Sequence, residues 1–161
     1  MKPSSFVLTA AALLSLALAV TPAAAVADSK FKILHNFTDG TDGGNPIIFA
    51  ALAIDNTGNL YGATYYGGTG CGGEGCGVVF QMSRSAGHWN ERVLFDATDP
   101  RTQGYFDSPL IVDSEVDLYG CAADGPMFEL MPGAPQWTYN PIWPSGCAGP
   151  VGLTFDGASN I

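Results

Sequence analysis

The sequence predicts an all-β protein made of antiparallel four-stranded sheets. The first observation is that no segment after Ala27 shows a sustained apolar pattern with the period of a helix. The second is that the apolar runs are short and end at Gly, Pro, Asp or Asn, as strands do. The third is composition: 21 glycines and 11 prolines accompany only 13% charged residues, which favours short strands and tight turns over long helices.

The expected strands fall into two sets along the chain. In each set, short apolar runs stop at turn-forming residues. The first set covers 31–37, 49–54, 60–66, 78–83 and 88–95. The second set covers 109–113, 118–123, 127–131 and 136–143, and one further strand is expected at 152–156.

A sequence unit recurs through these strands. The segment Leu52–Gly62 aligns with Leu110–Gly120, and a third copy runs from Leu153 to Ile161. Corresponding positions lie about 43 to 58 residues apart, which is the size of a four-stranded propeller blade. We therefore expect an incomplete array of β-propeller-like blades, with about two blades and part of a third.

The repeat also divides the chain. Residues 33–95 form the first repeat, 96–143 a degenerate second repeat and 144–161 a truncated third repeat. Because propellers close with about four to eight blades, this length does not complete a ring alone. We expect either self-association that completes the propeller or a chain that is part of a longer protein.

Each repeat contains an aspartate-led turn. In the first, the Asp55 side chain is expected to accept hydrogen bonds from backbone N–H groups just ahead, while Gly58 takes a positive φ and Asn59 completes the turn. The second repeat has Val116 where the first has Gly58. Because a β-branched residue resists the left-handed conformation, we expect Asp117 to be the left-handed residue there.

The order of these motifs is similar to one known family. It reads Asp42-Gly-Gly-Asn-Pro46, then Asp55 to Thr64, then Gly67-Gly68, and then Cys76-Gly-Val-Val-Phe80. This pattern resembles the bacterial GloVer tandem repeat, of which the chain looks like a partial or truncated member. The resemblance implies an exported β-propeller protein from a group with varied surface anchors, and it implies no particular chemistry.

The N-terminus is typical of export. An uncharged apolar run from Phe6 to Val20 follows Lys2, is shorter than the roughly 20 residues of a membrane-spanning helix, and precedes an Ala-x-Ala site ending at Ala27. We expect residues 1–27 to be a signal peptide, residues 28–161 to be secreted to the periplasm or outside the cell, and no membrane span to remain. In such a compartment the four cysteines can form disulfides, of which Cys71–Cys76 is the local choice and leaves Cys121–Cys147.

Charge limits the partners. The net charge of −9, without a cluster of Lys or Arg, repels phosphate backbones and anionic lipids, so nucleic acid is not expected to bind. The glycine-rich loop with Asp39, Asp42 and Asn45 offers oxygen ligands that could hold calcium, whereas a solvated hairpin loop is the alternative and no other cofactor is expected.

No residue is predicted to be catalytic. Asp55, Asp113 and Asp156 occupy one repeated position, which favours a turn-forming role over an acid/base pair. We therefore expect a non-catalytic scaffold that binds carbohydrate or a cell-envelope protein. The alternative is part of an extracellular propeller enzyme, a polysaccharide hydrolase or lyase that uses aspartates. Aromatic side chains on a rigid β surface can stack on sugars, and the candidates are Tyr65, Tyr66, Trp89 and Trp137.

Overall fold

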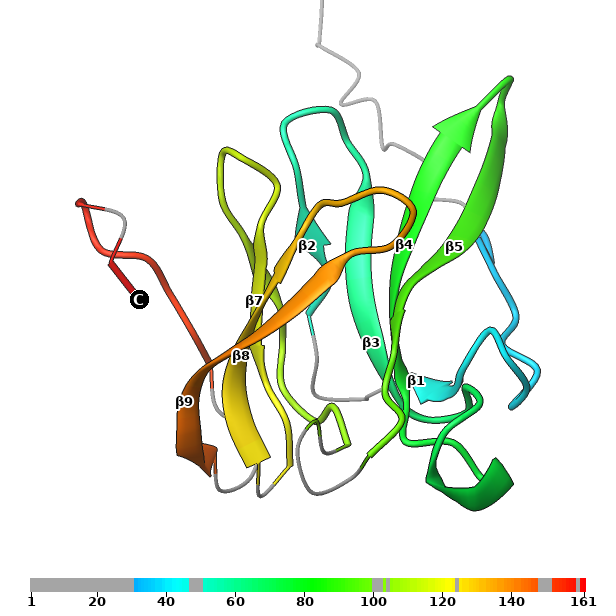
Figure 1. The fold of residues 1–161 in the computed structure, drawn as a ribbon. Helices are drawn as coiled ribbons and strands as arrows, with labels where there is room; N and C mark the ends of the chain where they lie inside the picture. Colours follow the sequence, from blue (N-terminus) through cyan, green and yellow to red (C-terminus); the bar gives the residue numbers. More distant parts are fainter. Residues whose placement is uncertain are drawn as a thin grey trace, which may run out of the picture. The chain divides into compact units, whose positions relative to one another are not determined.

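The fold was analysed in a computed structural model of the protein. The structure describes residues 31–46, 51–99, 103, 105–123, 125–147, 152–158 and 160–161. Residues 33–161 form one compact unit that contains all the described strands. The described part is all-β, as predicted, and its strands form two antiparallel sheets (Figure 1). The predicted signal peptide, residues 1–27, lies outside the described residues.

The first sheet lies in the N-terminal half of this unit. Its strands pair in the order β1-β3-β4-β5, with β2 added to β3, and a short 3₁₀ turn, η1, lies in the loop between β3 and β4. The strands are β1 (Gly44–Pro46), β2 (Ala53–Ile54), β3 (Leu60–Tyr66), β4 (Val78–Ser85) and β5 (His88–Asp96), and η1 is Cys71–Gly73.

The second sheet follows chain order and is a four-stranded meander, β6-β7-β8-β9. Its strands are β6 (Ile111–Val112), β7 (Leu118–Cys121), β8 (Gly125–Met131) and β9 (Thr138–Cys147). Short turns join several neighbouring strands, such as residues 86–87 between β4 and β5, whereas residues 67–77, which include η1, separate β3 from β4.

Two predicted strands are wrong. Residues 31–37 and 152–156 are not strands, and a short strand that was not predicted, β1, lies at Gly44–Pro46. Neither segment pairs with a strand through its backbone, but each packs an aromatic side chain on a sheet residue. The Phe37 ring lies 4.9 Å from that of Phe80, and the Phe155 ring lies 5.6 Å from that of Tyr119. Phe37 and Phe155, two of the apolar residues that suggested strands, therefore serve side-chain packing.

Corresponding residues of the two sheets pair in the same register. Tyr61 on β3 lies opposite Gln81 on β4, and Tyr119 on β7 lies opposite Glu129 on β8. Gly62 lies opposite Phe80 in the same way as Gly120 lies opposite Phe128. The alignment that relates the two segments in sequence thus also relates their positions in the sheets.

The two paired glycines have a packing reason. A Cβ atom at Gly62 would lie 2.6 Å from Cζ of Phe80 and 2.7 Å from Cδ2 of Leu52. At Gly120 it would lie 2.7 Å from Phe128 and from Leu110, which are the corresponding residues. Only a residue without a side chain lets the phenylalanine ring and the leucine lie over the strand.

The main core is shared by the two sheets. One cluster of buried residues includes Tyr61 and Val79 of the first sheet together with Leu118, Phe128 and Leu130 of the second. The Phe95 ring stacks on Tyr139 at 4.9 Å, and Tyr61 lies 6.4 Å from Trp137. The sheets therefore bury one face of each against the other, which holds their turns in fixed relative positions.

Candidate functional site

The first repeated turn is built around the Asp55 carboxylate. Its Oδ1 accepts hydrogen bonds from the backbone N–H of Thr57 at 2.8 Å and of Asn59 at 2.9 Å. Its Oδ2 accepts from Nδ2 of Asn59 at 2.8 Å and from the hydroxyl of Tyr61 at 2.9 Å. Gly58 has a φ of 86°, as predicted. Both carboxylate oxygens are thus used to hold the turn.

The second and third turns repeat this arrangement. Oδ1 of Asp113 accepts from the backbone N–H of Glu115 and of Asp117, each at 2.9 Å. Oδ1 of Asp156 accepts from the corresponding N–H groups of Ala158 at 2.7 Å and of Asn160 at 2.9 Å. The repeated aspartates therefore act in the same way on the backbone, which is the role that their spacing favoured.

The prediction for the second turn was wrong in one respect. Val116, and not Asp117, has the positive φ, at 73°. The Asp113 hydrogen bonds fix the direction of the N–H groups on both sides of Val116, so the residue between them must adopt the conformation that Gly58 adopts in the first turn. The steric preference of a β-branched side chain is overridden by its neighbours.

These hydrogen bonds set the protonation of the aspartates. Burial raises the pKa of Asp55, but hydrogen bonds donated by Asn59, Thr57 and Tyr61 together outweigh burial and hold that pKa far below its ordinary value. The hydrogen bonds from Asn59's counterpart, Asn160, lower the pKa of Asp156. Both carboxylates are therefore anionic at neutral pH, and neither is tuned to act as a general acid.

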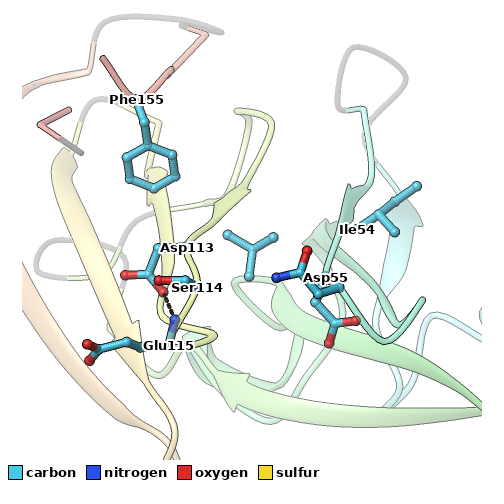
Figure 2. Close-up of a pocket in the computed structure, with 8 residues that line it drawn as sticks. Ile54, Asp55, Asp113, Ser114, Glu115 and Phe155 are labelled. Carbon is cyan, nitrogen blue, oxygen red and sulfur yellow. Dashed lines mark hydrogen bonds between the residues drawn. The ribbon is translucent and has the colours of Figure 1, made fainter. Parts of the chain in front are cut away.

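The turns converge on one cavity, which we call the turn cleft (Figure 2). Figure 2 shows Ile54 and Asp55 on one side, Asp113, Ser114 and Glu115 on the other, and Phe155 of the third copy beside them. Its volume is about 480 Å³. The full lining is Ile54, Asp55, Asn56, Val112, Asp113, Ser114, Glu115 and Phe155, so it joins apolar side chains from all three copies to acidic and neutral polar groups.

A second cavity, the tryptophan groove, shares Asp55 and Glu115 with the turn cleft and lies between the two sheets. Its volume is about 510 Å³. It is lined by Asp55, Thr57, Asn59, Tyr61, Gln81, Arg92, Glu115, Val116, Pro132, Gly133 and Trp137. Trp137 also lines a hollow of about 350 Å³ together with Arg92 and Asp96.

The tryptophan groove combines one large aromatic ring with a mixed set of polar groups. Trp137 is half-buried, and Arg92 and Glu115 are exposed. The Gln81 amide donates a hydrogen bond to the Tyr61 hydroxyl at 3.0 Å, which fixes the amide and leaves its carbonyl oxygen as an acceptor. An aromatic face beside carboxylate, amide and guanidinium groups matches the alternating apolar and hydroxylated faces of a sugar.

Comparison with protein-family models, curated proteins and solved structures found no match to this chain.

The other predicted aromatic residues lie apart from this groove. Tyr65 stacks on Tyr105 at 4.8 Å, and the half-exposed Tyr66 lies at 4.8 Å, edge-on to Tyr65. Trp89 is half-buried on β5, opposite Arg84 on β4. Tyr65, Tyr66 and Trp89 are not among the residues that line the turn cleft or the tryptophan groove. Of the four aromatic candidates, the structure places Trp137 beside the repeated turns.

The predicted calcium loop is organised by its own hydrogen bonds. The Asp42 carboxylate accepts from the Thr38 hydroxyl at 2.5 Å and lies 3.2 Å from Nε2 of His35. These groups lower the pKa of Asp42, with the Thr38 hydroxyl as the largest contributor. Asp39 and Asn45 both have positive φ, at 59° and 49°. Among the described residues no cluster of three His, Cys, Asp or Glu side chains is close enough to hold a metal, and calcium at this loop stays a prediction.

The structure contains two disulfides, Cys71–Cys76 and Cys121–Cys147. The first closes the glycine-rich loop around η1, and the second joins the end of β7 to the end of β9. They are the two pairs that the local spacing favoured, and they are compatible with an oxidising periplasmic or extracellular compartment. Within the described part of the chain there is no helix of the length and hydropathy that a bilayer span requires.

The groove residues that were not foreseen from the sequence include Gln81, Arg92 and Glu115. Gln81 and Arg92 lie opposite each other on β4 and β5, next to Tyr61 on β3, so strand register alone brings them together. For the first sheet, the alternation of side chains along paired strands could have predicted that Gln81 and Arg92 lie on the same face as Tyr61. Glu115 comes from the other sheet, and only the packing of one sheet on the other places it in the groove.

Proposed function

We propose that this protein is an exported, non-catalytic repeat scaffold that binds carbohydrate in the tryptophan groove. The two sheets with their shared register support an array of β-propeller-like repeats, which is also what the resemblance to GloVer repeats implies. In this proposal the repeated turns form the rigid floor, and the residues between the sheets contact the ligand.

The observation that carries the proposal is the position of Trp137. Its half-buried ring lines the tryptophan groove together with Tyr61, Gln81 and Arg92. The carboxylates of Asp55 and Glu115 line the same groove. A ring that lies directly before β9 and packs on the core offers a sugar a stacking surface at little conformational cost. The neighbouring carboxylate and amide accept hydrogen bonds from sugar hydroxyls, and Arg92 can bind the carboxylate of an acidic sugar.

The use of the aspartates argues against the enzyme alternative. Asp55 and Asp113 each accept two backbone hydrogen bonds on one oxygen, so their carboxylates are turned toward their own turns. A glycosidase needs one carboxyl group whose pKa is raised and a second that faces the same bond. The pKa of Asp55 is shifted in the opposite direction.

The test is calorimetric titration of the purified protein with a panel of neutral and uronic-acid oligosaccharides. We expect one class to bind, and we expect Trp137→Ala to weaken it about tenfold, which is roughly 1.4 kcal/mol and within the range of an aromatic contact. Because Trp137 also packs on the core, Glu115→Gln and Arg92→Gln provide exposed variants that keep the fold. Each should weaken binding severalfold.

Trp89→Ala and Tyr66→Ala are the matched controls, because both residues are aromatic and lie outside the groove. We expect both to bind as the unmodified protein does. Loss of binding in Tyr66→Ala with retention in Trp137→Ala would place the ligand at the tyrosines instead. Absence of binding across the panel would reject the carbohydrate proposal. Sustained release of reducing sugar ends, abolished when an aspartate outside the repeated turns is changed, as in Asp42→Asn, would establish the enzyme alternative.

A further inference from the structure

A cavity on the second sheet corresponds to the tryptophan groove, and we call it the Trp143 hollow. Its volume is about 550 Å³. It is lined by Tyr119, Met127, Glu129, Asn140, Ile142, Trp143, Asn160 and Ile161. Three of these residues lie side by side on neighbouring strands, because Tyr119 on β7 is opposite Glu129 on β8, and Glu129 is opposite Asn140 on β9.

The same three positions of the first sheet line the tryptophan groove. Tyr61 on β3 is opposite Gln81 on β4, and Gln81 is opposite Arg92 on β5. All three residues line the groove. The two cavities therefore use equivalent positions of their sheets.

The next repeated turn along the chain also lines each cavity. The second turn contributes Glu115 and Val116 to the tryptophan groove. The third turn contributes Asn160 and Ile161 to the Trp143 hollow. The hollow is therefore the groove displaced by one repeat.

An exposed tryptophan supplies the aromatic surface of the hollow. Trp143 on β9 is 64% exposed, and its neighbour Ile142 is 43% exposed. By register the counterpart of Trp143 on the first sheet is Phe95, whose ring is stacked on Tyr139 at 4.9 Å. The ring of the hollow thus comes from its own sheet, whereas Trp137 reaches the tryptophan groove from the neighbouring sheet. A large exposed ring on a strand offers a sugar a stacking surface.

The two cavities differ in the charge of their polar groups. Where the groove has Gln81 and Arg92, the hollow has Glu129 and Asn140. Two donors hold the Glu129 carboxylate in place: the Tyr119 hydroxyl at 3.0 Å from Oε1, and Nδ2 of Asn140 at 2.9 Å from Oε2. Each carboxylate oxygen has a second lone pair that can accept from a ligand. Among the described residues that line the hollow, Glu129 is the one charged side chain.

The surroundings of the Tyr119 hydroxyl are negative. Burial raises the pKa of Tyr119, and its hydrogen bond to Glu129 and the charges of Glu129, Asp113 and Asp117 raise that pKa further. The hydroxyl therefore stays protonated and donates to Glu129. A carboxylate in such surroundings favours a cationic group of a ligand over an anionic one.

We propose that the Trp143 hollow binds a sugar with a free amino group, with the sugar ring on Trp143 and the ammonium group on Glu129. A protonated amine donates charge-assisted hydrogen bonds to a carboxylate, whereas an N-acetylated amine donates only a weaker neutral one. The choice of a sugar as the ligand rests on the proposed carbohydrate function. The site and the charge of the sugar are different, because Arg92 suits the tryptophan groove to an acidic sugar.

The experiment is calorimetric titration of the purified protein, at mildly acidic pH, with chito-oligosaccharides that have free amino groups. Their fully N-acetylated forms are the matched ligands, and we expect them to bind about tenfold more weakly because a charge-assisted hydrogen bond is lost. Trp143→Ala and Glu129→Gln should each weaken binding of the free-amine form about tenfold. Trp143 is exposed, and glutamine already occupies the position of Glu129 in the first sheet, so circular dichroism should show a native fold for both variants.

Two further variants separate the hollow from the groove. Trp89→Ala is the matched aromatic control, since Trp89 lines neither cavity, and it should bind the amino sugar as the unmodified protein does. Arg92→Gln should weaken binding of uronic-acid oligosaccharides without weakening that of the amino sugar.

An exchange of the polar pair tests the role of charge directly. Glu129→Gln combined with Asn140→Arg gives the hollow the pair that the groove has in Gln81 and Arg92. We expect the folded double variant to lose the amino sugar and to bind uronic-acid oligosaccharides severalfold more tightly. Amino-sugar binding that survives this exchange would overturn the proposal.

Amino-sugar binding that is lost in Arg92→Gln and kept in Trp143→Ala would also overturn it, and would place the amino sugar in the tryptophan groove. So would equal binding of the free-amine and N-acetylated forms, or binding of neither form. Failure of the proposed function is a separate result, because it is read from the neutral and uronic-acid panel and from Trp137→Ala.

Discussion

The hydroxyl of Tyr61 donates a hydrogen bond to Oδ2 of Asp55 over 2.9 Å and so connects the first repeated turn to β3. Burial raises the pKa of Tyr61, and its hydrogen bond to Asp55 acts in the same direction. The tyrosine therefore stays neutral and donates, while Asp55 stays anionic and accepts. This pair therefore connects the turn to β3. It also connects the turn to the contact between the sheets, because the buried Tyr61 ring lies near that of Trp137.

Asp55→Asn should destabilise the protein by about 2 kcal/mol, since an amide nitrogen would face the donors on Asn59 and Tyr61. The pKa of Asp55 is depressed in the folded state, so its contribution is complete above the ordinary pKa of about 4 and is lost as the pH falls below it. Urea unfolding from neutral to acidic pH should show this loss in the wild type and a shallower one in Asp55→Asn. The exposed counterpart Asp156→Asn is the control and should change the pH profile much less.

Val116→Asn should stabilise the protein by about 1 kcal/mol, because asparagine tolerates the left-handed conformation that valine resists. The reverse change in the first turn, Gly58→Val, should cost about 1 kcal/mol or more. The midpoint of urea unfolding measures both. A stabilising Gly58→Val would contradict the view that the two turns share one backbone requirement.

Gly62→Ala and Gly120→Ala should each cost about 2 kcal/mol, because the added methyl group meets Phe80 or Phe128 at less than contact distance. Gly152→Ala is the matched control, since an added Cβ there meets no atom within 4 Å. Thermal unfolding of the three variants checks this. Equal effects at all three positions would indicate a backbone effect and not a packing effect.

The two disulfides should differ in their contribution. Cys121–Cys147 spans 26 residues and Cys71–Cys76 spans 5. By chain entropy, removing the first with a pair of alanines should cost about 3.5 kcal/mol and removing the second about 2 kcal/mol. Chemical unfolding without reductant measures the difference, and reductant should have no further effect on a variant that lacks both.

The sequence predicted the parts of the fold that depend on local chemistry. The aspartate-led turn at Asp55 was predictable because the acceptor, the glycine and the N–H groups lie within five residues. The same reasoning failed at Val116, where hydrogen bonds from both neighbours outweigh the preference of the residue itself. Residues 31–37 were misread for another reason: whether an apolar run pairs as a strand depends on a partner that its own sequence does not contain.

The residues of the candidate site were harder to predict from the sequence than the fold was. Trp137 could be selected as an aromatic candidate, but nothing local separated it from Trp89, which lies outside the groove. The decisive facts, that Arg92 lies opposite Gln81 and that Glu115 reaches them from the second sheet, follow from register and from sheet packing. Such long-range placement is not contained in the spacing of residues along the chain.

The residue after each turn aspartate contributes no side chain to the hydrogen bonds that hold its turn, although Asn56 and Ser114 both line the turn cleft. Mutation at this position is therefore tolerated by folding while it alters the lining of the cavity. The three corresponding positions already differ, with asparagine at residue 56, serine at residue 114 and glycine at residue 157. Substitution here changes the shape and polarity of the turn cleft while the hydrogen bonds of the turn stay in place.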